Sequence, residues 1–310
     1  MGQKSNPIAL RSNLKNYIDF SRFIEKNRKD STHIIHQDLE IRKYINRFFN
    51  LHGLILVNCL INRYHNNLEL IISYFTTINS IKLIKNKNIS LSKHKSKKKH
   101  IQTNKRLIKK RSFSVLKRKK FFFNKRVKKV IIFKKISFFN KLLASLNLFL
   151  LHRYNIKIIL QNVNKSLSFR LKNKEAYLYR KVISKLRFYS RSSFFSESIN
   201  ILLLFIKKKN MSKLLIEFIS LNLSVLKRHN FFLTFIRRAL IIFLNTKYSL
   251  VRGLKIRISG RFNGAARSKT RVFQIKKIPL QTLHSNINYN QSTSFTNNGT
   301  FGIKLWVYTK

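Results

Sequence analysis

The sequence predicts an α+β protein, with helices first and a mostly antiparallel four-stranded sheet at the end of the chain. Apolar residues recur at helical spacing in several segments before residue 245, whereas apolar and polar residues alternate in the segments after residue 250. The chain has 310 residues, is 44% hydrophobic and contains 27 Phe and 11 Tyr. This composition supplies one large or two ordinary hydrophobic cores.

The first part of the chain predicts an arm, a helix and a hairpin. Residues 1–30 are expected to form an arm that docks on a partner. A helix should begin near Ser31, with Asp38 as a capping residue, and end at His52-Gly53. Its apolar stripe comprises Leu39, Ile41, Tyr44, Ile45, Phe48 and Phe49. The strand-like runs that follow are Leu54–Ile61 and Leu68–Phe75, joined by the polar segment Asn62–Asn67.

A basic insertion is expected at about residues 76–137. From Lys82 to Lys135 there are 23 Lys or Arg and no acidic residue. Short apolar groups such as Phe121-Phe122-Phe123 interrupt the charge. Two interpretations stay open at this point: a solvated, weakly specific segment, or a segment that becomes ordered on RNA.

Regular structure is expected to resume after the insertion. A helix at Phe138–His152 and a strand at Ile156–Val163 come first. The helices expected next are Asn173–Ser190, Ser196–Lys209 and Ser212–Asn245, the last broken near His229-Asn230. The final strands are expected at 254–262, 268–276, 284–290 and 300–308.

The charge balance points to a polyanionic partner. Lys and Arg number 66 against 9 Asp and Glu, which gives a formal net charge of +57, and no acidic residue follows Glu217. Self-repulsion of this size disfavours the compact state unless the fold is held against a polyanion such as nucleic acid.

Several classes of function are not expected. The apolar runs are too short to cross a bilayer, so no membrane association is predicted. Cys59 is the only cysteine, which excludes an internal disulfide and a Cys-rich zinc site. The carboxylates are scattered and no Gly-rich phosphate loop is present, so neither an enzyme nor a cofactor, metal or small-molecule substrate is predicted.

The stretch Gly253–Arg271 predicts a cationic two-stranded surface. Lys255 and Arg257 alternate with apolar residues, a turn follows, and Lys269 and Arg271 alternate in the second strand. The candidate RNA contacts are Lys4, Lys227, Arg228, Arg237, Arg238, Lys255, Arg257, Arg261, Arg267, Lys269, Arg271 and Lys304.

Each candidate has a plainer interpretation. The strand cations could line a solvated sheet face, but no acid is near in sequence to balance them, which favours RNA. Arg237 and Arg238 lie among apolar residues of a helix, where an arginine stem can simply cover the core. Phe301 and Trp306 could stack on bases, but their place in a sheet favours the core.

Several sequence blocks closely resemble the ribosomal protein S-three family of the small ribosomal subunit. The opening Met1–Lys4 with Asn6-Pro7 and the helix segment Asp38–Ile45 resemble the family's N-terminal part. The C-terminal blocks are GLKIRISGRFNGAARSKT at 253–270, IPLQTL at 278–283 and FGIKLWVY at 301–308. The blocks occur in the family's order, and the mitochondrially encoded form is the expected member because of the insertion and the Lys-, Asn-, Ile- and Phe-rich composition.

The resemblance implies a fold and a place of action. Residues 31–170 would be a KH-like domain of type II, interrupted by the insertion, and residues 171–310 the family's C-terminal domain. The chain would bind small-subunit rRNA in the head, near the channel through which mRNA enters. The implied neighbours are ribosomal proteins S-ten and S-fourteen, with S-four and S-five across the channel. The expected location is the mitochondrial matrix, with plastid or bacterial cytoplasm as the alternative.

Two departures from the family stand out. No glycine occurs between Gly53 and Gly253, so the Gly-x-x-Gly loop with which KH domains clamp nucleic acid is missing. Leu233-Thr234 stands where the family has a basic pair on a helix at the mRNA channel, so this role rests on Arg237-Arg238 or moves to Lys227 and Arg228. The alternatives to a ribosomal role are a free organellar RNA-binding or intron-maturation factor of the same fold, and a scaffold that recruits other subunits through the insertion.

Overall fold

A computed structural model describes residues 6–14, 21–23, 28–64, 66–78, 80, 138–164, 173–208 and 210–309. The expected basic insertion lies almost entirely outside these residues. The chain divides into two compact units, one of residues 1–77 and 157–310 and one of residues 78–156. In the second unit, a helix over residues 138–149 buries Leu142 and Leu146 at helical spacing, and Leu150, just after its end, is also buried.

The N-terminal half of the first unit packs a long helix on a sheet. Helix α1 (Arg28–Leu51) precedes strands β2 (Leu54–Tyr64) and β3 (Asn67–Thr76). The sheet order is β1-β2-β3-β4, completed by β1 (Ser21–Arg22), which runs parallel to β2, and β4 (Asn155–Asn162). Strands β2 and β3 extend into the segment expected as their connector, because Asn62 pairs with Glu69 and Tyr64 with Asn67.

Asp38 is not a helix cap, contrary to the prediction. It lies inside α1, which begins ten residues earlier at Arg28, and it is 2% exposed. Its carboxylate accepts hydrogen bonds from Nη2 of Arg63 at 2.6 Å and from Nε at 3.0 Å. Both donors meet the same oxygen, Oδ1, and this pair joins α1 to β2 with the charges of both partners in the interior. The helix ends as predicted, at Gly53 with φ 68°.

The described residues between the two sheets form four α-helices. They are α4 (Asn173–Lys185), α5 (Phe195–Lys207), α6 (Ser212–Val225) and α7 (His229–Leu244). The break between α6 and α7 falls at residues 226–228, just before the predicted position. The segment expected as one helix to Ser190 ends at Lys185 and continues as the short 3-10 helix η3 (Arg187–Tyr189).

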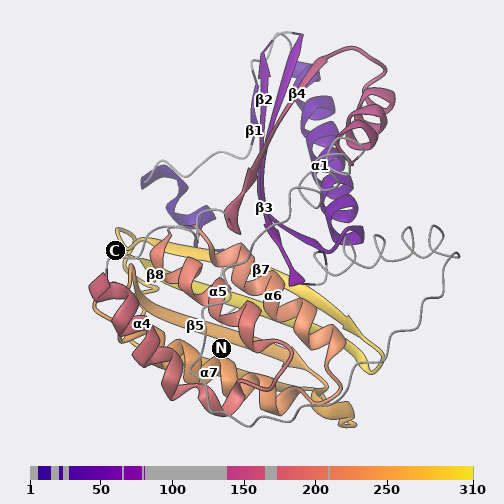
Figure 1. Ribbon diagram of the computed structural model, residues 1–310. Coiled ribbons are helices and arrows are strands. Elements are labelled where there is room, and N and C mark those ends of the chain that lie inside the picture. The colour runs from indigo at the N-terminus through magenta and orange to yellow at the C-terminus, as the bar shows by residue number, and fades with distance from the viewer. Residues whose placement is uncertain are drawn as a thin grey trace, which may run out of the picture. The chain divides into compact units, whose positions relative to one another are not determined.

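The C-terminal sheet has four antiparallel strands, which confirms the predicted α+β class. Its strands are β5 (Val251–Gly260), β6 (Lys269–Ile275), β7 (Ile287–Thr296) and β8 (Gly299–Thr309), in the order β6-β5-β8-β7. Figure 1 shows α5, α6 and α7 against one face of this sheet. Because β8 is preceded by the tight turn at Asn297-Asn298, β7 and β8 form a long hairpin.

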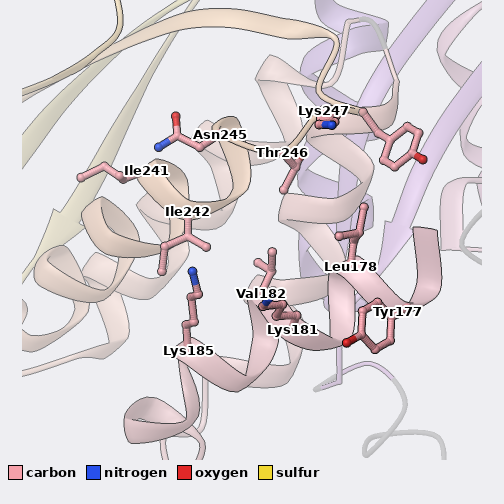
Figure 2. Close-up of a pocket in the computed structure, with 11 residues that line it drawn as sticks. Tyr177, Leu178, Lys181, Val182, Lys185, Ile241, Ile242, Asn245, Thr246 and Lys247 are labelled. Carbon is pink, nitrogen blue, oxygen red and sulfur yellow. The ribbon is translucent and has the colours of Figure 1, made fainter. Parts of the chain in front are cut away.

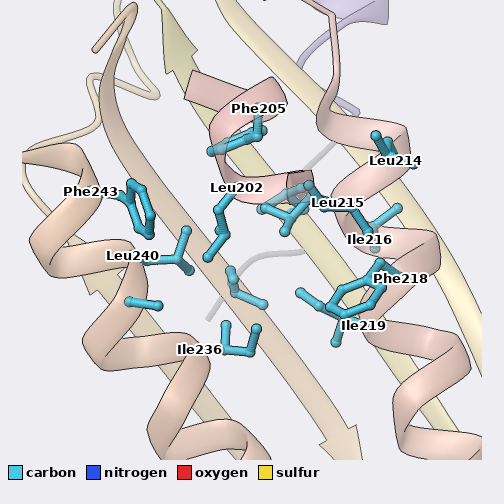
Figure 3. Packing of buried hydrophobic residues seen from close by; sticks show 14 of the residues in the cluster. Leu202, Phe205, Leu214, Leu215, Ile216, Phe218, Ile219, Ile236, Leu240 and Phe243 are labelled. Carbon is cyan, nitrogen blue, oxygen red and sulfur yellow. The ribbon is translucent and has the colours of Figure 1, made fainter. Parts of the chain in front are cut away.

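The core lies between these helices and that face of the sheet. Leu202 and Phe205 of α5, Leu215 and Phe218 of α6, and Leu240 and Phe243 of α7 are at most 2% exposed. Figure 3 shows these side chains gathered in one cluster. The strands contribute Leu254, Ile256, Ile258 and Leu305. Each such side chain contributes roughly 1.5–3 kcal/mol relative to exposure, so this cluster fixes which sheet face is buried.

Part of the N-terminal arm docks on the chain itself. The 3-10 helix η1 (Ala9–Leu14) places Arg11 at 0% exposure, where its guanidinium donates to the carbonyl oxygens of Leu280 at 2.7 Å and Thr282 at 3.0 Å. The arm was predicted to dock on a partner. In the described part, its anchor is instead the segment between β6 and β7.

Candidate nucleic-acid interface

The face of the C-terminal sheet opposite the core carries the candidate cations of β5. Side chains directly opposed in an antiparallel ladder point to the same face. Lys255 is opposed by Trp306 of β8, and Arg257 by Lys304. On β7, Tyr289 opposes Trp306 and Gln291 opposes Lys304. We call the face that carries these six residues the open face.

Two cations face each other on the open face without a carboxylate. Arg257 and Lys304 are both exposed and directly opposed. Like charges in this position destabilise a sheet by roughly 0.2–1 kcal/mol. No Asp or Glu occurs in any strand of this sheet, because the last acidic residue of the chain is Glu217. The arrangement therefore favours the binding of an anion between or above the two side chains.

Aromatic side chains continue the open face beside the cations. Nζ of Lys255 lies 5.8 Å from the ring centroid of Trp306, and the Trp306 and Tyr289 rings are 5.4 Å apart. Partial burial raises the pKa of the Tyr289 phenol, which keeps the hydroxyl protonated at neutral pH. Trp306 is largely buried, as predicted, but it lies on the opposite side of the sheet from the core. Phe301, by contrast, is in the core as predicted.

The register does not place Lys269 and Arg271 with Lys255 and Arg257. Lys269 opposes Gly260 and Arg271 opposes Ile258, which belongs to the core face. The predicted cationic face shared by the two strands is therefore wrong. The guanidinium of Arg271 lies 4.5 Å from the ring centroid of Phe262, so its planar group covers an aromatic core residue while its charge stays at the edge of the core.

A histidine joins the two loops that carry other candidates. The backbone N–H of His229 donates to Oδ1 of Asn263 at 2.8 Å, and the backbone N–H of Asn263 donates to Nδ1 of His229 at 3.2 Å. With Nδ1 as acceptor, Nε2 carries the proton and donates to the carbonyl oxygen of Leu223 at 3.2 Å. Burial lowers the pKa of His229, which favours this neutral form.

This contact brings basic residues from two segments to one end of the sheet. Lys227 and Arg228 directly precede His229, and Arg261 lies two residues before Asn263. Arg267 follows in the connection to β6 and Lys269 is the first residue of β6, and all five of these side chains are exposed. Arg261 is held by a hydrogen bond from Nε to the carbonyl oxygen of Ala265 at 2.9 Å. We call the group of Lys227, Arg228, Arg261, Arg267 and Lys269 the loop cluster.

The helical pair lies on α7, on the side away from the core. Arg237 and Arg238 are both exposed, and Arg238 donates from Nη1 to the hydroxyl of Tyr189 at 3.1 Å. Leu233 is 1% exposed, so it packs in the core, and Thr234 is exposed. The open side of α7 thus offers one arginine, Arg237, whose guanidinium the hydrogen bond to Tyr189 does not engage.

The last candidate RNA contact, Lys4, lies outside the described residues. Among the residues that the structure describes, no three His, Cys, Asp or Glu side chains form a group that could hold a metal ion. None of the described helices is both long and apolar enough to span a membrane.

Sequence reasoning missed how the aromatic residues and Arg252 contribute. Arg252 is exposed, and its Nη1 donates to the hydroxyl of Tyr308 at 3.2 Å. Tyr289 and Trp306 flank Lys255 only because three strands come into register. Alternation within one strand identifies the two faces, but it does not say which residues of strands distant in sequence come to lie opposite each other.

Comparisons with known proteins point to one family. A family model described as "Ribosomal protein S3, C-terminal domain" matches residues 233–307, which comprise most of α7 and all of the C-terminal sheet up to Val307. The "Small ribosomal subunit protein uS3" of Bdellovibrio bacteriovorus is 43% identical over 58 residues, covering 19% of this chain and 26% of that protein.

Two further relatives are also small ribosomal subunit proteins named uS3 or uS3c. The uS3 of Trichodesmium erythraeum is 47% identical over 58 residues, covering 19% of this chain and 24% of that protein. The "Small ribosomal subunit protein uS3c" of Tetradesmus obliquus is 43% identical over 58 residues, covering 19% of this chain and 8% of that protein. The match spans about a quarter or less of the length of these relatives.

Proposed function

Because the chain belongs to the ribosomal protein uS3 family, we propose that it is a structural constituent of the small ribosomal subunit that binds small-subunit rRNA. The observation that carries this proposal is the acid-free open face, on which Arg257 and Lys304 directly oppose each other. Phosphate oxygens would relieve the repulsion of these cations. Contacts of this kind position a protein on RNA without reading its sequence. No catalytic role is part of the proposal.

The domain division extends the proposal to the whole chain. Residues 31–170 form a KH-like domain with an insertion at about 76–137, and residues 171–310 form the C-terminal domain. Support comes from α1, β2, β3 and β4, which follow in this order around one sheet. Since no glycine lies between Gly53 and Gly253, the KH-like domain has no Gly-x-x-Gly clamp. RNA binding therefore falls to the open face, the loop cluster and the insertion.

The place in the subunit is the head, near the channel through which mRNA enters. Arg237 would contact mRNA there, because it is exposed on α7 and free of the Tyr189 hydrogen bond that holds Arg238. Lys227 and Arg228 lie in the loop before α7 and provide further charge. The proposed protein neighbours are ribosomal proteins S-ten and S-fourteen, with S-four and S-five across the channel.

The double variant Arg257→Ala with Lys304→Ala tests the role of the open face. Binding to an rRNA fragment from the subunit head should weaken, and the slope of log K against log salt should become shallower by roughly 1.4–1.8, the contribution of two phosphate contacts. The matched control removes two exposed cations elsewhere, Arg187→Ala with Lys277→Ala. An equal change in both variants would show that net charge alone governs binding.

Sedimentation distinguishes the ribosomal role from that of a free RNA-binding factor. A constituent of the subunit should remain with small subunits in high salt. A factor held only by a few phosphate contacts should be released as counterions compete. Recovery of the chain only in the salt-wash fraction would contradict the proposal.

The proposed compartment is the mitochondrion. Support comes from the Lys-, Asn-, Ile- and Phe-rich composition, typical of AT-rich organelle genes, and from the large insertion. Quantitative mass spectrometry of purified organelles tests this assignment. Enrichment with plastid ribosomes, or presence in a bacterium that has no organelles, would overturn it.

A further inference from the structure

A groove with an apolar floor lies between α4 and the C-terminal end of α7. Its volume is about 860 Å³. Its floor includes Leu178 and Val182 of α4 and Ile242 of α7, which are half-buried. Figure 2 shows Val182 and Lys185 pointing from α4 toward Ile242. The groove lies apart from both the open face and the loop cluster, because none of their residues lines it.

The rim of the groove is basic and contains no carboxylate. Lys181, Lys185 and Lys247 line it and are exposed, and its eleven lining residues include no Asp or Glu. The acidic residue of α4, Glu175, is already paired with Lys207 at 2.8 Å. No carboxylate among the lining residues therefore balances the three lysines, and an occupant with carboxylates would do so.

The groove also exposes large apolar and aromatic side chains. Tyr177 is 67% exposed, Tyr248 41% and Ile241 38%. Tyrosines beside aliphatic side chains are typical of protein interfaces. An RNA strand could place phosphates on the lysines and bases on the two tyrosines, but it would leave the aliphatic floor of Leu178, Val182 and Ile242 without an apolar partner, whereas a protein helix would cover it. The surface chemistry thus favours a protein occupant over RNA.

The chain's own sequence does not suit the groove. The long segment 82–135 has 23 cations and no acid, so it would be repelled by the lysine rim. A second copy of the chain would bring another formal charge of +57. Charge complementarity therefore selects a different, acidic protein.

We propose that the groove between α4 and α7 binds an amphipathic, acidic helix of a partner protein. The lining residues of α4 run from Tyr177 to Lys185, about two helical turns or roughly 12 Å. An occupying helix would place apolar side chains at i, i+3 or i+4 on the floor, and Glu or Asp on its flanks would reach the lysines. This protein contact is separate from the proposed RNA binding and does not depend on it.

A designed peptide tests the site on the full chain. The probe is a fluorescein-labelled helical peptide with Leu at i, i+3, i+4 and i+7 and Glu on both flanks. A matched peptide keeps every Glu and replaces each Leu with Ser. Binding is followed by fluorescence anisotropy at moderate salt. The Leu peptide should bind at least about tenfold more tightly than the Ser peptide, the equivalent of about 1.4 kcal/mol.

Two variants and a control localise the binding. Ile241→Asp should weaken the Leu peptide at least about tenfold, because it places a negative charge at the apolar surface. Lys181→Glu with Lys185→Glu should do so through the rim, and it alters only exposed positions, so it keeps the test decisive if Ile241→Asp unfolds. Lys277→Glu, exposed and outside the groove, should leave peptide binding unchanged.

Two results would overturn the proposal. Equal binding of the Leu and Ser peptides would mean that only net charge attracts them. If the Lys181→Glu, Lys185→Glu variant loses affinity for a single-stranded RNA oligonucleotide but not for the Leu peptide, the groove is an RNA surface. Failure of the peptide to bind would leave the rRNA measurements on Arg257 and Lys304 unaffected, so the two proposals fail independently.

Discussion

The two four-stranded sheets of this protein balance their charges differently. In the N-terminal sheet, Arg63 of β2 meets the buried carboxylate of Asp38 at 2.6 Å, and Lys157 of β4 lies 3.6 Å from Glu69 of β3. In the C-terminal sheet, Arg257 opposes Lys304 and no strand carries an acidic residue. In the described residues, the N-terminal sheet thus has ion pairs with acidic residues of the chain itself, whereas Arg257 and Lys304 of the C-terminal sheet face each other in a sheet without an acidic residue. The family's recognisable sequence lies in the sheet with the unbalanced charge.

The largest effect should come from removing the acid of α1 that pairs with the N-terminal sheet. Asp38→Ala leaves the Arg63 guanidinium buried without its carboxylate, which should lower the free energy of unfolding by about 3–5 kcal/mol in urea titration. Glu40→Ala, on the same helix, is the control. It removes an exposed i,i+3 pair with Lys43 and should change stability by at most about 0.5 kcal/mol. Equal losses would show that the buried pair is not what completes this sheet.

The second-largest loss of stability is expected at His229, which joins the two loops that carry the loop cluster. His229→Ala removes the acceptor for the Asn263 N–H and the donor to Leu223, and should cost about 1–3 kcal/mol in unfolding free energy. The exposed His284→Ala should have little effect. If the two variants have the same stability, His229 does not join the two loops.

The same histidine should make stability depend on pH. Because burial lowers the pKa of His229, the unfolded chain takes up a proton at higher pH than the folded chain. The contribution should be complete above about pH 6.5, decrease as pH falls toward the folded pKa, and be constant below it. The His229→Ala variant should lose this dependence in urea titrations between those limits, and a slope that persists would assign it to another group.

Removing one lysine from each sheet should change the free energy of unfolding in opposite directions. Lys304→Ala relieves the repulsion with Arg257 and should stabilise the free protein by up to about 1 kcal/mol, while it weakens RNA binding. Lys157→Ala removes the exposed partner of Glu69 and should destabilise by at most about 1 kcal/mol. Urea unfolding of both variants, without RNA, decides this. Destabilisation by Lys304→Ala would mean that a group other than an external anion already balances this side chain.

The sequence predicted the fold better than the arrangement of the site. Period and alternation located most helices and strands, because the burial of one face imposes these patterns on the residues themselves. Asp38 was misplaced because a polar residue near an expected helix start is equally compatible with a cap and with a buried ion pair. Lys269 and Arg271 were assigned to the wrong face because the face of β6 depends on the turn at 261–268. The Trp306, Tyr289 and Lys255 group arises from register between strands that are distant in sequence.

The thiol of Cys59 tests the comparison between the two sheets, with the smallest expected effect on stability. Burial raises the pKa of Cys59 on β2 to about 11, so almost none of it is thiolate at pH 8. The native protein should react with Ellman's reagent more than about a hundredfold more slowly than the urea-unfolded chain, whose thiol has a pKa of about 8.5. As the counterpart on the C-terminal sheet, Thr293→Cys combined with Cys59→Ala places an exposed thiol on β7, which should react rapidly because nearby cations favour the thiolate. If bound RNA protects this engineered thiol and leaves the reactivity of Cys59 in the native protein unchanged, the anion lies on the open face of the C-terminal sheet; protection of neither thiol would place the anion elsewhere.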